Sequence, residues 1–554
     1  MVNQHKNPTA VSRLKDSIVL GHNNGTIIST PLINYYMKRH GVQSDFINVE
    51  DEGQISRLNS SEKEEALIIG NFQGLFENNY SFKKLRPPIF ITHMLIECGQ
   101  ELIHIDCIRI QMSLKNNSCL HILGAGPAGL ASAYYAKKCE IPAMLYESSN
   151  TVGGNCKTIV DGDYRYDTGA HRFHDKLDHA TKEVQELIGD DLLKVNSPSM
   201  IFSNNRMFDF PLGLLSILRN LGGVDIAKIL TENIFNISRI SSKPTNFKDL
   251  AYQVYGKTLS ELFLINYTEK LWGRPAHTLD VNISGNRLKN LNMEKLFREL
   301  LFSNDKTDHL DGSFYYPKYG FGTIFEKMEN YIGESNIRFN SPVTKLVHDK
   351  KNIVELVYGN TRITDIDKVI TTLPVNLLIN CMEPSPPEKI KDIVNNIKYR
   401  DLNLCVIYLD IPSFTENASI YFPEPTFPFT RIYEPKNRSN KMAPEDKTCI
   451  VVETPYDHEA LPDGMPKKEL FQIISNILIE NKFINREQII GHKDIDAKYA
   501  YPILETGIKE RLEPIFSYLG NFENMYTIGR SAQFKYIHTH DIFMQARSII
   551  NKLK

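Results

Sequence analysis

The sequence predicts an α/β fold with more than one domain, in which strands and helices alternate around a parallel sheet. Its 554 residues exceed the roughly 150 residues of an ordinary domain. Apolar residues make up 42% and charged residues 23% of the chain, which allows a large core and excludes global disorder. Short apolar runs alternate with helix-like stretches before residue 100 and again after residue 118, as they do in α/β proteins.

Composition and charge exclude several classes of protein. The 64 basic and 66 acidic residues nearly cancel, so bulk charge does not predict nucleic-acid binding. The 8 cysteines include no C-x-x-C pair, which argues against a secreted disulfide scaffold and a structural zinc site. The polar start of the chain does not resemble a secretory signal, and no run approaches the roughly 18 apolar residues of a membrane span. We therefore expect a soluble, cytoplasmic protein without a transmembrane segment, with oligomerisation left open.

The sequence pattern of residues 1–113 predicts a small α/β module of unknown role. Its expected strands and helix come in alternating order: a strand at 17–21, a helix at 30–40, and strands at 44–49, 65–70 and 87–95. The glycine turn after the first strand lacks the G-x-G-x-x-G spacing, so we assign it no nucleotide and regard the module as degenerate or regulatory. The polar composition of residues 112–118 predicts a linker.

A dinucleotide-binding fingerprint follows the linker. The apolar strand 119–123 enters a G-x-G-x-x-G turn, a helical stretch follows, and the next strand ends in Glu147. In a Rossmann-type fold the first two glycines allow a tight turn and close approach to a pyrophosphate, while the third lets the helix pack on the strand. The helix N-terminus then offers N–H donors to phosphate, and the acid accepts bonds from the adenosine ribose. We therefore predict that the cofactor is bound by Gly124, Gly126, Pro127, Ala128, Gly129 and Glu147.

The next segment favours FAD over NAD. It contains the glycine doublet Gly153-Gly154, followed by Asn155 and, after two residues, Thr158. Here the sequence resembles the FAD-binding superfamily of amine oxidases, protoporphyrinogen oxidases and UDP-galactopyranose mutases. In that superfamily the doublet lets the chain pass beside the extended cofactor. The resemblance implies that these four residues contact FAD.

The resemblance extends from about residue 119 to the end of the chain. It rests on further motif-like segments at 166–174, 201–212, 267–273, 314–328, 341–347, 367–374 and 527–530. It implies that 166–174 passes beside the isoalloxazine and that backbone groups of Val343 meet the adenine. It also implies a discontinuous cofactor domain from 119–200, 333–378 and 501–554. The insertions 201–332, expected to be helical, and 379–500, expected to contain strands, would form the substrate domain.

The C-terminal motif also has a physical explanation. Gly529 allows close backbone approach, and the Arg530 guanidinium can neutralise a pyrophosphate. Asp541 precedes a helical apolar pattern, as a residue near a helix N-terminus does. That N-terminus, aimed at the flavin N1/O2 edge, would stabilise the negative charge of reduced flavin.

Four residues are candidates for catalysis on the substrate side: His171, Arg172, Trp272 and Arg431. A histidine beside the flavin could donate or relay protons near neutral pH, and arginines suit carboxylate or diphosphate groups. The alternatives are a structural histidine, solvated arginines and a tryptophan that packs in the core. A metal is not expected, because the pair His171 and His174 has no evident third ligand. Further pocket candidates are Arg274, Arg287, Tyr501 and Tyr536.

Three functions fit these motifs. The first is an FAD-dependent oxidoreductase that transfers hydride from a small-molecule substrate to flavin N5. The second is a redox-neutral sugar mutase that uses reduced FAD on a nucleotide sugar, as in UDP-galactopyranose mutase. The third is a non-catalytic FAD-binding protein. The first hypothesis is favoured by the oxidase-like segment 314–328. The second is favoured by Gly153-Gly154-Asn155, by the segments 169–174 and 267–273, and by the closing motif that runs from Gly529 to Asp541.

Overall fold

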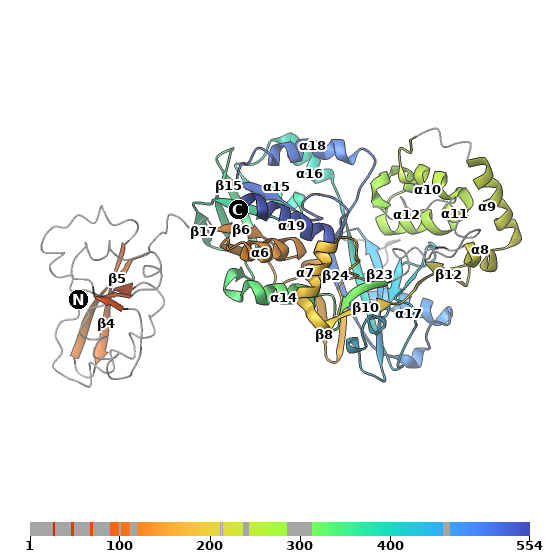
Figure 1. Ribbon diagram of the computed structural model, residues 1–554, viewed down its shortest axis with the longest axis horizontal. Helices are drawn as coiled ribbons and strands as arrows, with labels where there is room; N and C mark the ends of the chain where they lie inside the picture. Colours follow the sequence, from red (N-terminus) through yellow and green to blue (C-terminus); the bar gives the residue numbers. More distant parts are fainter. Residues whose placement is uncertain are drawn as a thin grey trace. The chain divides into compact units, whose positions relative to one another are not determined.

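The computed structural model describes residues 119–210, 212, 214–236, 243–284, 313–457 and 466–554, together with five strands between residues 26 and 110. The chain divides into two units, Met1–Asn117 and Ser118–Lys554, and each is described by itself (Figure 1). The predicted strand 17–21 and helix 30–40 lie outside the described residues.

The described strands of the first unit form two small sheets. The longest are β4 (Ile89–Cys98) and β5 (Glu101–Ile110), which pair as an antiparallel hairpin. The short strand β1 (Thr26–Ile27) pairs antiparallel with β5, and β2 (Phe46–Asn48) pairs parallel with β3 (Leu67–Ile69). Strands were predicted where β2, β3 and β4 lie. Strand β5 was not predicted, although its several isoleucines favour an extended conformation.

The second unit is built on a five-stranded, wholly parallel sheet. Its strands, in spatial order, are β14 (Ile337–Arg338), β7 (Ala143–Tyr146), β6 (Leu120–Leu123), β18 (Lys368–Thr371) and β25 (Met525–Thr527). All four residues of β6 are buried. Ile122 packs in one hydrophobic cluster and Leu123 in another. Successive side chains of a strand point to opposite faces, so both faces of the sheet are covered, as parallel sheets require.

Helices cover one face of this sheet, and helices with a second sheet cover the other (Figure 1). The first face carries α6 (Pro127–Lys138), α7 (Asp178–Ile188), α14 (Thr323–Ile332) and α19 (Thr539–Leu553). The second face carries α15 (Val375–Asn380), α16 (Glu388–Asn396), α18 (Ile508–Leu519), and the sheet of β17 (Thr361–Thr364), β16 (Ile353–Tyr358), β15 (Val343–His348) and β19 (Met382–Glu383).

The second large sheet of this unit has seven strands, with both parallel and antiparallel pairs. In spatial order its strands are β12 (Arg206–Phe210), β11 (Ser199–Ser203), β21 (Ser419–Tyr421), β22 (Arg431–Tyr433), β23 (Thr448–Tyr456), β20 (Tyr399–Leu409) and β24 (Ile489–Pro502). Its helix α17 spans Leu470–Glu480. A helical group lies at one end of the sheet (Figure 1) and comprises α8 (Leu214–Asn220), α9 (Gly223–Asn236), α10 (Phe247–Tyr255), α11 (Lys257–Ser260) and α12 (Asn266–Trp272).

Two short two-stranded antiparallel sheets complete the unit. They pair β8 (Thr158–Asp161) with β9 (Tyr164–Asp167), and β10 (Leu192–Asn196) with β13 (Ser313–Pro317). The mixed α/β class agrees with the expectation from the sequence. The five parallel strands come from 119–200, 333–378 and 501–554, whereas β11 begins at Ser199 and β24 ends at Pro502. The exact domain boundaries stay a prediction. Within the described part of the chain, no helix is both long and apolar enough to cross a membrane.

Candidate active site

Three glycine-containing turns meet at the N-terminus of α6. Pro127 is the first residue of this helix and Gly126 is its N-cap, with no side chain capping the N–H groups. A Cβ on Gly154 would lie 3.2 Å from Cα of Gly126, and a Cβ on Gly529 would lie 2.9 Å from Cβ of Ala128. The doublet therefore packs backbone against backbone on the first turn, and Gly529 packs against the methyl group of Ala128. This arrangement presents N–H donors at a helix N-terminus, which suits a phosphate.

The first of these turns requires glycine at two positions. Gly124 has a φ of +94°, a left-handed conformation that residues with a Cβ rarely adopt. A Cβ on Gly129 would lie 1.8 Å from the carbonyl oxygen of Gly124. The doublet adds two more left-handed residues, because Gly153 has a φ of +95° and Gly154 a φ of +52°. Helix α6 can therefore begin directly above the end of β6, as the fingerprint predicts.

Glu147 lies at the end of β7 against the glycine turn. Its Oε2 accepts a hydrogen bond of 2.8 Å from the backbone N–H of Ala125, and Oε1 accepts one of 2.8 Å from the N–H of Ser149. These bonds fix the carboxylate, which has further lone pairs for a ribose hydroxyl. The backbone oxygen of Glu147 accepts from the N–H of Ser341. That contact brings the segment leading to Val343, the first residue of β15, beside the acid.

Two predicted cofactor residues use their side chains within the protein. The Asn155 amide donates to the carbonyl oxygen of Lys498 at 2.7 Å. The Thr158 hydroxyl donates to Oδ1 of Asp167 at 2.6 Å and accepts from the N–H of Gly322 at 2.8 Å. Cofactor contacts by Asn155 and Thr158 remain predictions. Because the Thr158 hydroxyl already donates one hydrogen bond and accepts another within the protein, a contact between Thr158 and the cofactor would involve its backbone.

The C-terminal residues also have protein partners. The Arg530 guanidinium donates to the carbonyl oxygen of Ile537 at 2.9 and 3.1 Å and to that of Ala500 at 3.3 Å. Asp541 lies in the first turn of α19, where its Oδ2 accepts from the backbone N–H of His538 at 3.0 Å. Helix α19 therefore begins at Thr539, earlier than the sequence predicts, and Asp541 bonds the N-cap residue from within its first turn. Contact between Arg530 and a pyrophosphate stays a prediction.

His171 is a half-buried histidine beside the glycine doublet. Its Nε2 donates to the carbonyl oxygen of Asn155 at 2.7 Å, and its ring stacks on Phe321 with centroids 5.2 Å apart. Burial, together with the positive charges of Arg530 and Arg431, lowers the pKa of His171 to about 3. At neutral pH the imidazole is therefore unprotonated. It can orient by hydrogen bonding, but it does not carry a proton to donate as an imidazolium.

This neutral state makes stability depend on pH. The folded pKa of His171 is depressed, so the unfolded state binds a proton that the folded state does not. His171 stabilises the fold fully above the unfolded pKa of 6.5, and this contribution falls by about 1.4 kcal/mol per pH unit as pH drops toward about 3. We expect the free energy of unfolding of His171→Gln to approach that of the wild type between about pH 6.5 and pH 4. Urea denaturation of both proteins measures it, and a difference that does not change with pH contradicts the prediction. Burial also lowers the pKa of His121, to about 4. Because His121 is present in both proteins, its effect on the free energy of unfolding cancels in the difference between them.

Arg172 joins the turn after His171 to the seven-stranded sheet. Its Nη2 donates to Oγ of Ser199 at 2.9 Å and to Oγ of Ser419 at 3.0 Å. Its guanidinium lies 4.8 Å from the ring centroid of Phe314. These contacts place Arg172 between β11, β21 and β13.

Arg431 forms an ion pair with a residue that the sequence analysis did not select. Its Nε and Nη2 each donate to an oxygen of Glu453 at 2.8 Å. The same carboxylate accepts from the backbone N–H of Ala170 at 2.9 Å. Glu453 therefore connects strand β22 to the turn at 169–171. Sequence reasoning had no signal for this pair, because it depends on the register between two strands.

Aromatic rings surround this ion pair. Tyr267 packs edge-on against Tyr421 with centroids 5.8 Å apart, and Trp272 packs edge-on against Tyr501 and Tyr536, each also at 5.8 Å. We call these five residues the aromatic cluster. The Arg530 guanidinium lies over the rings of Tyr501 and Tyr536, and Arg431 lies over Tyr421. Trp272 is only 3% exposed. Its position is therefore that of a residue packed in the core, which was the alternative to a catalytic role.

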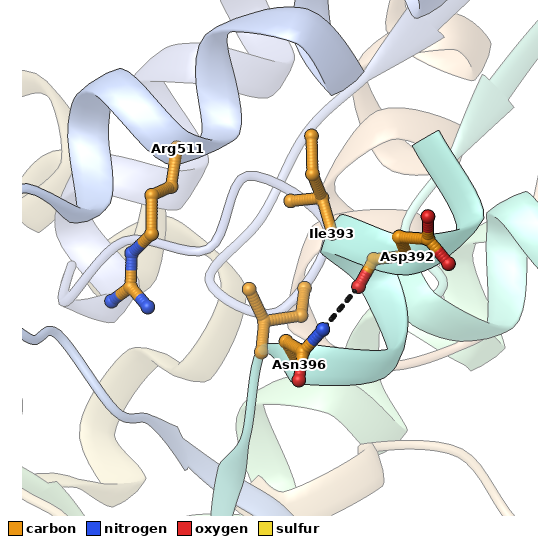
Figure 2. A pocket seen from close by; sticks show the side chains of 5 residues that line it. Asp392, Ile393, Asn396 and Arg511 are labelled. Carbon is orange, nitrogen blue, oxygen red and sulfur yellow. Dashed lines mark hydrogen bonds between the residues drawn. The ribbon is translucent and has the colours of Figure 1, made fainter. Parts of the chain in front are cut away.

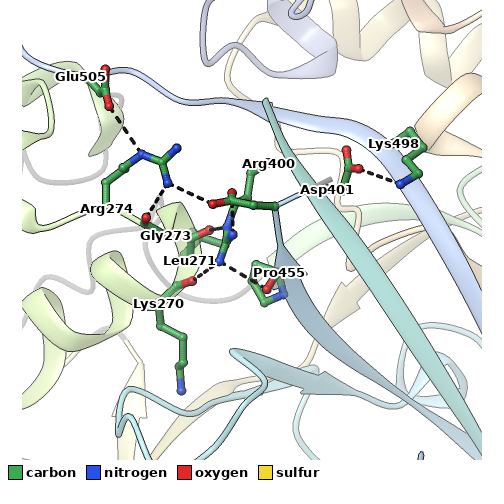
Figure 3. A network of polar contacts seen from close by, with 10 residues as sticks. Lys270, Leu271, Gly273, Arg274, Arg400, Asp401, Pro455, Lys498 and Glu505 are labelled. Atoms are coloured by element: carbon green, nitrogen blue, oxygen red, sulfur yellow. Dashed lines mark hydrogen bonds and ion pairs between the residues drawn. The ribbon is translucent and has the colours of Figure 1, made fainter. Parts of the chain in front are cut away.

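A polar network fixes the end of α12, which carries Trp272 (Figure 3). Arg400 donates to the carbonyl oxygens of Lys270 and Leu271 and pairs with Asp457 at 2.7 Å. Arg274, one of the predicted pocket arginines, pairs with Asp457 at 3.1 Å and with Glu505 at 3.5 Å. Both arginines therefore neutralise protein carboxylates. Arg287 lies outside the described residues.

A hollow elsewhere on the unit has no connection with this site (Figure 2). It lies between α16 and α18, and its volume is roughly 200 Å³. Its lining residues are Asp392, Ile393, Asn396, Ile397 and Arg511. None of them belongs to the glycine turns or the aromatic cluster. Among the described residues no group of histidine, cysteine and acidic side chains could hold a metal ion.

Comparison with known proteins decides the family. The model of the flavin containing amine oxidoreductases matches residues 127–480, which is more than half of the chain. The chain belongs to this family. It is a flavin-dependent enzyme and its cofactor is FAD. The resemblance inferred from the sequence motifs is confirmed. The residues at the N-terminus of α6 fit this cofactor, because the turns leave uncapped N–H groups beside a fixed carboxylate.

The individual relatives are distant. A 1-hydroxycarotenoid 3,4-desaturase from Flavobacterium sp. is 22% identical over 402 residues, which cover 64% of this chain and 80% of the relative. A phytoene desaturase from Phycomyces blakesleeanus is 24% identical over 263 residues, which cover 42% of this chain and 43% of the relative. The chain therefore matches less than half of the second desaturase.

Solved structures show the same fold at low identity. Reduced UDP-galactopyranose mutase superposes with a TM-score of 0.70 at 19% identity, covering 79% of this chain and 93% of that one. A protoporphyrinogen oxidase-like protein from Exiguobacterium sp. 255-15 superposes with a TM-score of 0.64 at 15% identity, covering 79% and 99%. Because these identities are low, the likeness is evidence for the fold and leaves the reaction open.

Proposed function

We propose that this enzyme is an FAD-dependent oxidoreductase in which hydride passes from a small-molecule substrate to flavin N5. The observation that carries the proposal is the neutral, aromatic character of the substrate side. Tyr267 and Tyr421 contribute rings, and Arg431 is paired with Glu453. A substrate that donates hydride from a carbon atom needs orientation and exclusion of water more than it needs a cluster of free charges.

In this proposal one set of protein groups would bind the cofactor and another set would position the substrate. The N–H groups at the start of α6 would hold the diphosphate and Glu147 would hold the ribose. The turn at 169–171 and the N-terminus of α19 would meet the isoalloxazine, where the helix dipole favours negative charge. Bound FAD supplies the hydride acceptor. The aromatic cluster would orient the substrate and exclude water from the reacting carbon.

A sugar mutase is the second candidate, and one observation favours it. The structure of reduced UDP-galactopyranose mutase matches this chain with a TM-score of 0.70 over 93% of its own length. Such a reaction on a nucleotide sugar needs cations for a diphosphate. Arg274 and Arg431 pair with protein carboxylates. This pairing supports the oxidoreductase over the mutase. Membership of an enzyme family removes the support for a non-catalytic FAD-binding protein.

Anaerobic spectroscopy of the holoenzyme separates these functions. We expect an oxidisable substrate, chosen from panels of amines, polyenes and alcohols, to bleach the visible band of bound FAD, and oxygen or a dye to restore it. A mutase would give the opposite result. It would leave oxidised FAD unchanged by nucleotide sugars and would isomerise them only after dithionite reduction, and that outcome would overturn the proposal.

A further inference from the structure

Three side chains form a row across the seven-stranded sheet. Tyr421 on β21 lies directly opposite Arg431 on β22, and Arg431 lies directly opposite Glu453 on β23. Residues that are directly opposite in neighbouring strands share one face of a sheet. Their contacts agree with this placement, because Arg431 lies over the Tyr421 ring at 5.8 Å and also bonds Glu453. The row therefore faces the turn at 169–171.

The Arg431–Glu453 pair is nearly sealed from solvent and electrically neutral. The guanidinium binds both carboxylate oxygens, Nε to Oε2 and Nη2 to Oε1, each at 2.8 Å. The side chain of Glu453 is 3% exposed and that of Arg431 is 14% exposed. Such a two-point pair has defined geometry as well as strong attraction in a poorly solvated place. The small exposed part of the guanidinium is what a ligand could reach.

A third bond connects the pair to the cofactor side. Oε1 of Glu453 also accepts from the backbone N–H of Ala170 at 2.9 Å. Ala170 precedes His171, whose Nε2 bonds the carbonyl oxygen of Asn155 beside the glycine doublet. One carboxylate thus holds both the cation on the substrate side and the turn that leads to the doublet.

We propose that Glu453 is a specificity-determining and positioning residue, which neutralises Arg431 so that the site accepts substrate groups without charge and rejects carboxylates and phosphates. This inference rests on the proposed function, in which the aromatic cluster is the substrate side. An anionic substrate would have to displace Glu453 from Arg431, leaving a buried carboxylate without its counter-ion. An uncharged substrate pays no such penalty.

The first test measures binding of benzoate to FAD-loaded protein by calorimetry and by the change in the flavin spectrum. In Glu453→Gln the Arg431 cation loses its counter-charge, so we expect benzoate to bind at least about tenfold more tightly than to the wild type. Glu434→Gln is the matched control. Glu434 is also fully buried beside β22, but it accepts from Phe414, Thr415 and Thr448 and contacts no arginine in the described structure. We expect no gain of benzoate binding in this control.

A second variant decides the matter if Glu453→Gln does not fold. Arg431→Ala leaves the Glu453 carboxylate in place, and we expect millimolar guanidinium to bind there and to perturb the flavin spectrum, while the wild type shows no such effect. Equal benzoate binding by the wild type and Glu453→Gln, a gain in Glu434→Gln, or no guanidinium binding by Arg431→Ala would each overturn the inference. These titrations need bound FAD but no turnover. Failure of the proposed oxidoreductase reaction would therefore be seen separately, as a flavin that no substrate bleaches.

Discussion

Gly129→Ala is expected to yield a protein that purifies without FAD and is destabilised by about 3 kcal/mol or more. A Cβ at this position would lie 1.8 Å from the carbonyl oxygen of Gly124 and 3.0 Å from its carbon. Both of these atoms are backbone, so no side chain can rotate away. Helix α6 would have to move off β6, and its N–H groups would move with it. The flavin absorbance of the purified protein and its thermal unfolding measure the two effects.

Gly222→Ala is the matched control for this prediction. No atom lies within 4 Å of a Cβ built on Gly222, in the turn between α8 and α9. We expect this variant to keep its FAD and to change the stability by less than about 1 kcal/mol. A Gly129→Ala protein with a full complement of FAD would show that the close contact between helix and turn is not needed to hold the cofactor.

The fold around the glycine turn could be predicted from the sequence because its signals are local. The strand, the turn, the helix and Glu147 all lie within residues 119–147. Gly129 has its position because of an atom only five residues earlier. Pro127 stands at the first position of α6, where its missing N–H costs nothing. Neighbours in sequence therefore determine this part of the cofactor site.

The proposed substrate side could not be predicted in the same way because its contacts join distant segments. Glu453 meets Arg431 only through the register of β22 with β23, and it meets Ala170 from the far end of the chain. A glutamate within an apolar stretch gives no signal of either partner. The same reason explains Arg530. Its attachment to carbonyl oxygens of Ile537 and Ala500 depends on how the last turn of the chain folds, whereas the sequence suggests only a cation near a glycine.

Lys270 is another residue that sequence reasoning missed, although it lies in the segment 267–273. Its Nζ donates to three backbone carbonyl oxygens, those of Phe422, Glu424 and Phe427, at 2.6, 2.8 and 3.0 Å. Burial lowers the pKa of Lys270 to about 7, whereas three acceptors favour the ammonium form, which alone has three N–H donors. The lysine thus fastens the chain after Tyr421 to helix α12, and both belong to the wall of the aromatic cluster.

Lys270→Met is expected to lower the free energy of unfolding by about 3 kcal/mol, because three carbonyl groups lose their shared donor in a poorly solvated place. FAD should stay bound, since the glycine turns do not contact this lysine in the described structure. Urea denaturation at about pH 6, where the amine is protonated, measures the loss. Lys257→Met, which removes an exposed lysine of α11, should change stability by no more than about 0.5 kcal/mol. If the two variants are equally stable, the three bonds do not hold the turn after Tyr421, and the aromatic cluster must be kept in place by ring packing alone.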